Sequence, residues 1–254
     1  MALGTPSASP AVVVKEIDLT GGVPNVQSTT GAIVGNFRWG PVGKRVLVDN
    51  EATLVDTFAT PDSASTVDFH SARYFLSYSS SLQVVREATS AAKNSRSPIG
   101  QLATDSDGSL PTEFVKNEED FDAQRSALDS DSHTIIGRYP GVLGNSLQVQ
   151  ICPSDATVFN SWAYKDEFDK APSTSDYASD RNATDDEIHI VVVDQDGKFT
   201  GTKGTVLETY PFLSVATDAK STTDGSTLYV KDVINERSEY VHFVDFDSNF
   251  TNFG

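Results

Sequence analysis

The chain has 254 residues, enough for one large domain or two small ones, and 19 Lys and Arg against 36 Asp and Glu leave a net charge of −17. So acidic a surface repels phosphate and argues against direct binding to nucleic acid or to an anionic membrane. No apolar run approaches the roughly 18 residues of a membrane span, and the start lacks the features of a secretory signal. The single cysteine, Cys152, excludes an internal disulfide. We expect a soluble protein made in a cytoplasm.

A valine-rich segment near the start predicts an extended strand. Val12, Val13 and Val14 are followed by Ile17 and Leu19, and β-branched side chains suit a pleated surface. Apolar side chains fall on both faces of this strand. It is therefore either an ordinary first strand or a strand that pairs with the sheet of a neighbouring chain. We expect an N-terminal arm at 1–20, followed by a Gly- and Pro-containing hinge at 21–30.

The next part of the chain predicts an α/β layer with at least one crossover connection. Asp49 or Asn50 can cap a helix with Leu54, Val55 and Phe58 on one face. A second helix follows Asp62 or Ser63. The predicted strands are at 31–37, 45–48 and 82–88. The order strand, helix, helix, strand is typical of such a layer.

The rest of the chain predicts short elements separated by long polar excursions. The excursions are expected at 90–112 and 155–187, because neither is apolar enough to form a core. Helices are predicted at 113–128 and from 232, and strands at 134–137, 146–152, 188–193, 206–208 and 240–244. A hairpin signal lies at 194–197. The expected fold is α/β, a mixed β-sheet flanked by helices, with an extended N-terminal β arm and long surface loops on a body at 31–254.

No catalytic or metal-binding set is recognisable, so we expect neither an enzyme nor a cofactor. The four histidines are far apart and have no zinc-ligand spacing, and Cys152 in a strand is typical of a small buried residue. Segments 105–108 and 194–197 match only part of a calcium loop and favour plain turns. Trp39 beside Gly40 and Pro41 is a candidate interface anchor, with local loop packing as the alternative.

Several motifs, in order, resemble those of one family. They are Ser-Pro-Ala-Val-Val-Val-Lys-Glu at 9–16, the strand at 32–35 leading to Trp-Gly-Pro at 39–41, 75–76 with 84–86, 139–147, 188–194 with 206–208, and 232–240. Together they resemble the N-terminal part of the contractile tail sheath proteins of T-even and cyanophage-like myophages. Ala11 stands where that family typically has Gly. The C-terminal core domain of the family is absent, so the chain resembles a fragment or a shortened relative.

The resemblance implies a structural subunit that polymerises around a tail tube and contracts to drive the tube through the host envelope. Its implied partners are copies of itself, the tail tube protein, and baseplate and tail terminator proteins. The implied location is the virion tail, after assembly in the host cytoplasm. Val12, Val13, Val14, Ile17, Leu19 and Trp39 are the candidate inter-subunit contacts.

Two rival functions remain on the sequence alone. A virion surface or adhesin module could bind host glycans through the aromatic, acidic stretch at 159–177. A hydrolase with an unrecognised site is the other, which the scattered histidines and the missing nucleophile argue against.

Overall fold

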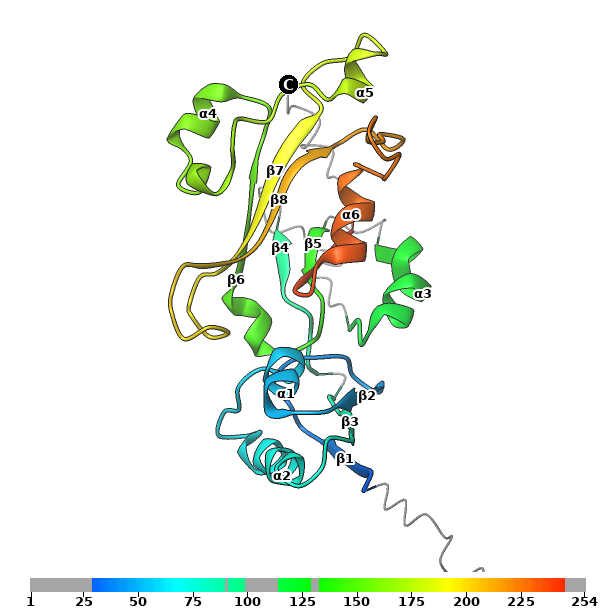
Figure 1. Ribbon diagram of the computed structural model, residues 1–254, viewed down its shortest axis with the longest axis vertical. Coiled ribbons are helices and arrows are strands. Elements are labelled where there is room, and N and C mark those ends of the chain that lie inside the picture. Colours follow the sequence, from blue (N-terminus) through cyan, green and yellow to red (C-terminus); the bar gives the residue numbers. More distant parts are fainter. Residues whose placement is uncertain (1–28, 90, 99–113, 129–132, 245–254) are drawn as a thin grey trace, which may run out of the picture.

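The computed structural model describes residues 29–89, 91–98, 114–128 and 133–244. The predicted arm, with Val12, Val13, Val14, Ile17 and Leu19, lies outside these residues, as does most of the predicted hinge. The described chain forms two lobes that lie end to end (Figure 1). We call residues 29–89 the N-terminal lobe and residues 91–244 the second lobe. None of the described helices is long and apolar enough to cross a membrane.

The N-terminal lobe is a three-stranded sheet covered on one face by two helices. Strand β1 (Gly31–Gly35) pairs in parallel with β3 (Leu82–Arg86), and β2 (Arg45–Val48) pairs antiparallel with the other edge of β3. Helices α1 (Glu51–Phe58) and α2 (Thr66–Leu76) form the connection between β2 and β3. The two predicted helices, the three strands and the crossover of this region are thus confirmed, but α2 begins at Thr66 after Ser65 rather than directly after Asp62 or Ser63.

Local sequence explains how this lobe forms. The Asn50 side chain accepts a hydrogen bond from the backbone of Thr53 and caps α1, as predicted. Phe58 and Phe69, one from each helix, lie in the same buried core as the inward residues of the sheet. Helix α2 packs so closely on β1 that a Cβ at Gly31 would lie 2.5 Å from the ring of Phe75. Small residues in β1 therefore allow the helix to approach.

The second lobe contains two further three-stranded sheets, both antiparallel. One sheet has the order β4-β5-β9 and the other β6-β7-β8. The strands are β4 (Arg96–Pro98), β5 (His133–Gly137), β6 (Leu147–Cys152), β7 (Glu187–Asp194), β8 (Thr205–Ser214) and β9 (Val241–Phe243). The helices are α3 (Glu118–Leu128), α4 (Ala156–Ser161), α5 (Asp176–Ser179) and α6 (Val230–Arg237), with 3-10 helices η2 (Val142–Ser146) and η3 (Lys165–Glu167).

One core joins the two sheets of the second lobe. Ile190 of β7, Phe243 of β9 and Ile234 of α6 are all buried in the same cluster. Strand β7 is central in its sheet, and its residues from Ile188 to Asp194 are all buried. A continuous Ile and Val run is what a strand covered on both faces requires. The prediction of a buried strand here is confirmed.

The structure corrects several predicted boundaries. The α/β class is confirmed, but the described strands form three small sheets rather than one mixed sheet. Strand β8 extends well beyond the predicted 206–208, and the hairpin loop before it runs from 195 to 204. The excursion at 155–187 is not a plain loop, because it contains α4, η3 and α5. Helix α3 begins at Glu118, five residues later than predicted.

Candidate functional site: the junction between the lobes

An aromatic cluster fills one side of the junction between the lobes. Trp39 is buried, and its ring makes edge contacts with Tyr139 and Phe199 at centroid distances of 5.4 and 5.1 Å. Leu143 of η2 belongs to the same cluster. Trp39 therefore packs within its own chain, as the local-packing alternative holds, and its role in an inter-subunit contact stays a prediction.

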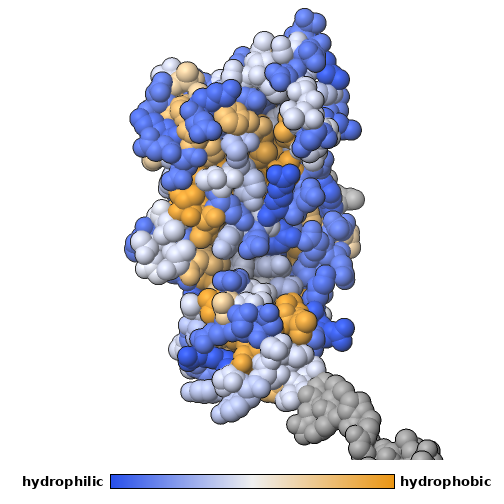
Figure 2. All heavy atoms as spheres, in the orientation of Figure 1, coloured by the Kyte–Doolittle hydropathy of each residue, from blue (hydrophilic) through white to orange (hydrophobic). Residues whose placement is uncertain are grey.

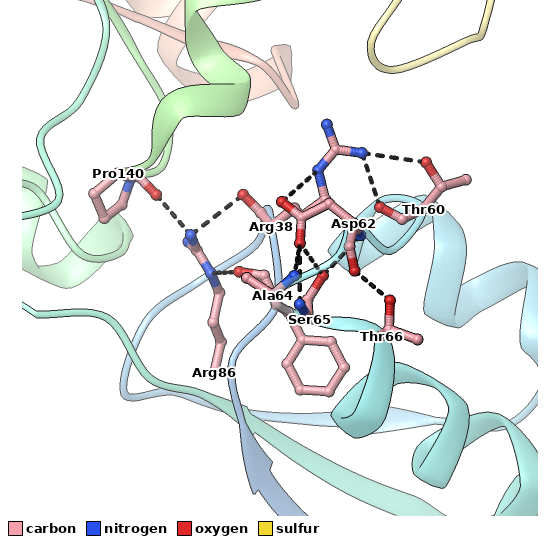
Figure 3. A network of polar contacts seen from close by, with 9 residues as sticks. Arg38, Thr60, Asp62, Ala64, Ser65, Thr66, Arg86 and Pro140 are labelled. Atoms are coloured by element: carbon pink, nitrogen blue, oxygen red, sulfur yellow. Dashed lines mark hydrogen bonds and ion pairs between the residues drawn. The ribbon is translucent and has the colours of Figure 1, made fainter.

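Arg86, the last residue of β3, connects the two lobes by hydrogen bonds (Figure 3). Its guanidinium donates to the carbonyl oxygens of Phe37 at 2.7 Å, Gly40 at 2.8 Å and Arg38 at 3.3 Å, all in the N-terminal lobe. It also donates to the carbonyl of Pro140 in the second lobe, at 2.6 Å. One side chain thus fixes the loop after β1 and ties it to the turn before η2.

Burial sets the electrostatics of Arg86. Desolvation lowers its pKa to about 10, while the nearby Tyr139 acts in the opposite direction. The guanidinium therefore stays charged at neutral pH. Its hydrogen-bond partners in the described chain are carbonyl oxygens, whose partial negative charge compensates the buried cation.

A second polar network holds the loop before α2 next to Arg86 (Figure 3). The Asp62 carboxylate accepts hydrogen bonds from the backbone of Ala64 and Ser65, both at 3.0 Å, and lies 3.6 Å from Arg38 Nε. Burial acts to raise the pKa of Asp62, but the hydrogen bonds from Ser65 outweigh it, so the pKa lies below its ordinary value. Arg38 also donates to the carbonyl of Thr60 at 3.0 Å. The charged groups here organise backbone.

The junction is also fastened on the side of α3. The backbone N–H of Val42 donates to the carbonyl of Lys116 at 2.8 Å, and the Asn117 side chain donates to the carbonyl of Val42 at 3.0 Å. Lys44 forms an exposed ion pair with Glu119 at 3.1 Å. Within the second lobe, close to its first residue, buried Asn94 donates a hydrogen bond to the carbonyl of Val115 and accepts one from the Val115 N–H. The lobes are held at more than one point.

Two clefts flank this junction. The larger, about 1030 Å³, lies where β1 and β3 end and is lined by 36–38, 62–65, 85–94 and 141–145 among others. The smaller, about 380 Å³, lies between α1 and the segment at 236–240. Among the described residues, no group of three or more His, Cys, Asp or Glu side chains could hold a metal ion. The larger cleft has the position of a ligand crevice in parallel sheets, but its buried Arg86 already donates four hydrogen bonds to backbone carbonyls.

His189 is a packed residue of strand β7. Its Nδ1 accepts a hydrogen bond from the backbone of Phe212 at 3.0 Å, which leaves the proton on Nε2 to bond the carbonyl of Lys170 at 2.9 Å. Phe212 has a positive φ of 52° where β8 bulges against β7. The imidazole therefore satisfies a backbone group that the bulge removes from the ladder. Burial lowers the pKa of His189 and favours this neutral form.

The predicted plain turn at 194–197 is confirmed as the start of a longer loop built on one carboxylate. Asp194 is buried and accepts hydrogen bonds from the backbone of Lys198, Phe199 and Thr200 and from the side chain of Ser146. Burial acts to raise the pKa of Asp194, but these hydrogen bonds outweigh it, so the pKa lies below its ordinary value.

Cys152 is free and buried, and burial raises the pKa of its thiol to about 11. An un-ionised thiol is a poor nucleophile at neutral pH.

The aromatic stretch of the glycan-binding alternative packs against the body of the second lobe. Trp162 stacks on Phe168 at 5.3 Å and donates a hydrogen bond to Gln150 of β6 at 2.9 Å. Phe168 in turn stacks on His189 at 4.3 Å. These rings anchor α4 and η3 to the sheet, and the two clefts at the junction lie elsewhere. Part of the aromatic stretch therefore has a packing role within the second lobe.

The junction and the loops thus use their buried polar side chains to fix backbone. The chain is 36% identical over 207 residues to the tail sheath protein of Salmonella phage ViI, covering 81% of this chain and 29% of that protein. It is 37% identical over 91 residues to the tail sheath protein of Enterobacteria phage T4, covering 36% of this chain and 14% of that protein. No protein-family model matches.

The chain is therefore homologous to phage tail sheath proteins, which confirms the family resemblance drawn from its motifs. It spans less than a third of the length of these relatives. Among solved structures it is similar to the sheath tail protein Lin1278 from Listeria innocua, with a TM-score of 0.40 and 11% identity, covering 86% of this chain and 30% of that one.

Proposed function

We propose that this chain is a structural subunit of a contractile phage tail sheath, which polymerises around the tail tube and contracts to drive the tube through the host envelope. The observation that carries the proposal is the 36% identity over 207 residues with a tail sheath protein. Contraction needs no active-site chemistry. It needs two packings of different free energy, with the extended packing kinetically trapped.

The junction supports a subunit that transmits force. Arg86, Trp39 and the α3 contacts hold the lobes together by hydrogen bonds and buried aromatic packing. Each lobe also has its own core. A subunit built this way can rotate as one body while the contacts between subunits change.

The proposed link between subunits is the arm at 1–20. Pairing of Val12–Leu19 with a neighbouring sheet would make about four to six ladder hydrogen bonds, each contributing a net ~0.5–1.5 kcal/mol. Each buried valine would add ~1.5–3 kcal/mol before the cost of ordering the arm. Repeated around stacked rings, such links would hold the lattice together during contraction. The hinge at 21–30 would absorb the change in angle.

The proposed partners are copies of the same chain, the tail tube protein, and the baseplate and tail terminator proteins. The proposed location is the virion tail, after assembly in the host cytoplasm. The net charge of −17 agrees with partners other than nucleic acid or an anionic membrane.

Deletion of residues 1–19 tests the proposed role of the arm. Both described cores lie outside this segment, so the shortened protein should remain folded and melt as the parent does. In the phage that encodes it, the shortened protein should not form sheaths visible by electron microscopy.

The point variant Val13→Asp should also prevent sheath assembly, and the conservative Val13→Ile should assemble normally. Intact sheaths from the deletion would overturn the arm mechanism, and a lower melting temperature for Val13→Asp would identify an ordinary internal strand.

A further inference from the structure

Helix α2 carries a second apolar face that points away from its own lobe. Its inward face buries Phe69 and Ala72. On the other side, Val67 is 76% exposed and Tyr74 is 65% exposed. Tyr78, one turn beyond Tyr74 and just after the helix, is 88% exposed. The spacing 67, 71, 74, 78 places these residues, with Ser71, along one stripe of a helix. We call Val67, Tyr74 and Tyr78 the α2 stripe.

The residues of the α2 stripe carry no charge, although the chain is strongly acidic. The two charged residues of α2, Asp68 and Arg73, are engaged within the lobe, Asp68 with the backbone of Asn36 at 2.8 Å and Arg73 with Glu51 at 2.7 Å. From position 74 to position 85 the sequence has no charged residue. In a chain with a net charge of −17, such a region is where a second copy can approach with the least like-charge repulsion.

The α2 stripe also lies beside the point where the chain enters the lobe. Ser79, next to Tyr78, donates a hydrogen bond to the carbonyl of Thr29, and Gly31 N–H donates to the carbonyl of Ser81 at 3.0 Å. Thr29, the first residue that the structure describes, therefore lies at this end of the lobe, and α1 lies between α2 and the second lobe (Figure 1). The α2 stripe is thus at the end of the described molecule that is remote from the second lobe.

We propose that the α2 stripe is a contact surface for a second copy of this chain. Tyr is enriched at interface hot spots because it combines a large apolar ring with a hydroxyl and has few rotatable bonds. Val34 and Leu47 are also exposed, on the open face of the N-terminal sheet. Leu47, however, is in register with the polar Gln83, and Val34 is in register with Val85, whose partner on β2 is the charged Arg45. The inference deepens the proposed sheath function by naming a surface, and it rests on that function.

Self-association of this chain, followed by sedimentation velocity over a range of concentrations, tests the inference. The double variant Tyr74→Ser/Tyr78→Ser should weaken association by about tenfold or more in Kd, because two exposed rings leave the contact. Val142→Ser is the matched control, since Val142 is 78% exposed on η2 in the second lobe and should leave association unchanged. Circular dichroism should show equal melting for all of these variants, because the changed side chains are exposed.

A photo-crosslinking amino acid at position 78 identifies the occupant. In a mixture of isotopically light and heavy chains, crosslinked peptides of mixed label should form and show a contact between copies. Crosslinks confined to one label would place the chain's own segment on the stripe and overturn the inference.

The outcomes separate this inference from the proposed function. If the double variant associates like the parent chain, copies meet through another surface, and the inference fails while the sheath role stands. If the parent chain stays monomeric at every concentration, the inference also fails, and the sheath role is then decided by locating the protein in the phage tail.

Discussion

Single residues at the junction hold elements that are distant in sequence, and Arg86 is the clearest case. Arg86→Met would remove three buried hydrogen bonds and one part-buried hydrogen bond to backbone carbonyls, and it should lower the free energy of unfolding by about 3–5 kcal/mol. Arg86→Lys should also destabilise, because one ammonium cannot reproduce the planar fork. Arg45→Met, at an exposed position of the same sheet, should stay within about 0.5 kcal/mol of the parent. Urea denaturation provides the measurement, and equal stability of the Met variants at 86 and 45 would contradict the role of Arg86.

His242 makes the stability of the second lobe depend on pH. The residue is fully buried in β9, its ring stacks on Phe121 at 3.9 Å, and neither ring nitrogen has a hydrogen-bond partner in the described chain. Burial, assisted by the charge of Arg138, lowers its pKa from 6.5 to about 3. Because the unfolded form takes up a proton first, the stabilisation is complete above pH 6.5 and is lost as the pH falls towards 3.

The variant His242→Phe tests this pH dependence. It keeps an aromatic ring against Phe121 and cannot be protonated. Between pH 7 and pH 5 the parent should lose roughly 2 kcal/mol more stability than the variant, because each pH unit below 6.5 is equivalent to about 1.4 kcal/mol. Urea denaturation at pH 7 and pH 5 measures the free energy of unfolding of each protein. Both proteins contain the same carboxylates, so their contribution cancels when the two losses of stability are subtracted. Parallel losses of stability would show that His242 does not titrate as described.

At the scale of elements, the sequence predicts the features that depend on residues close together in the chain. The Asn50 cap, the stripe of α1 and the Ile and Val run of β7 all predict the structure correctly. Strand partners were not predictable in this way, because three small sheets and one mixed sheet can have the same alternation along the chain. The length of β8 was also not predicted, because Pro211 lies within it and proline usually ends a strand. In the structure, Pro211 lies on an edge strand at a bulge, where proline is tolerated.

The junction was the least predictable part. Trp39 stood out in the sequence, but its neighbours Tyr139 and Phe199 are about 100 or more positions away. The role of Arg86 was missed, and its one signal was a cation at the end of an otherwise uncharged strand, Leu82–Arg86. Contacts between distant segments decide its partners, and no local propensity reports such contacts.

The described part of the molecule is elongated, with two lobes that lie end to end (Figure 1), and the sequence has a net charge of −17. On the face shown in Figure 2, hydrophilic residues cover most of the surface and hydrophobic ones gather in separate patches on both lobes. If the proposed contact holds, the α2 stripe joins copies of this chain at the end of the molecule that carries α2.

Gold-labelled antibodies against this chain, viewed by electron microscopy on the phage that encodes it, test the sheath role most directly. If the chain is a sheath subunit, the label should run along the whole length of extended tails and remain on the shortened sheath after contraction. A glycan-binding module on the virion surface should instead be labelled only at fibres or at the tip of the tail. Label restricted to those places, with a bare tail shaft, would contradict the sheath role.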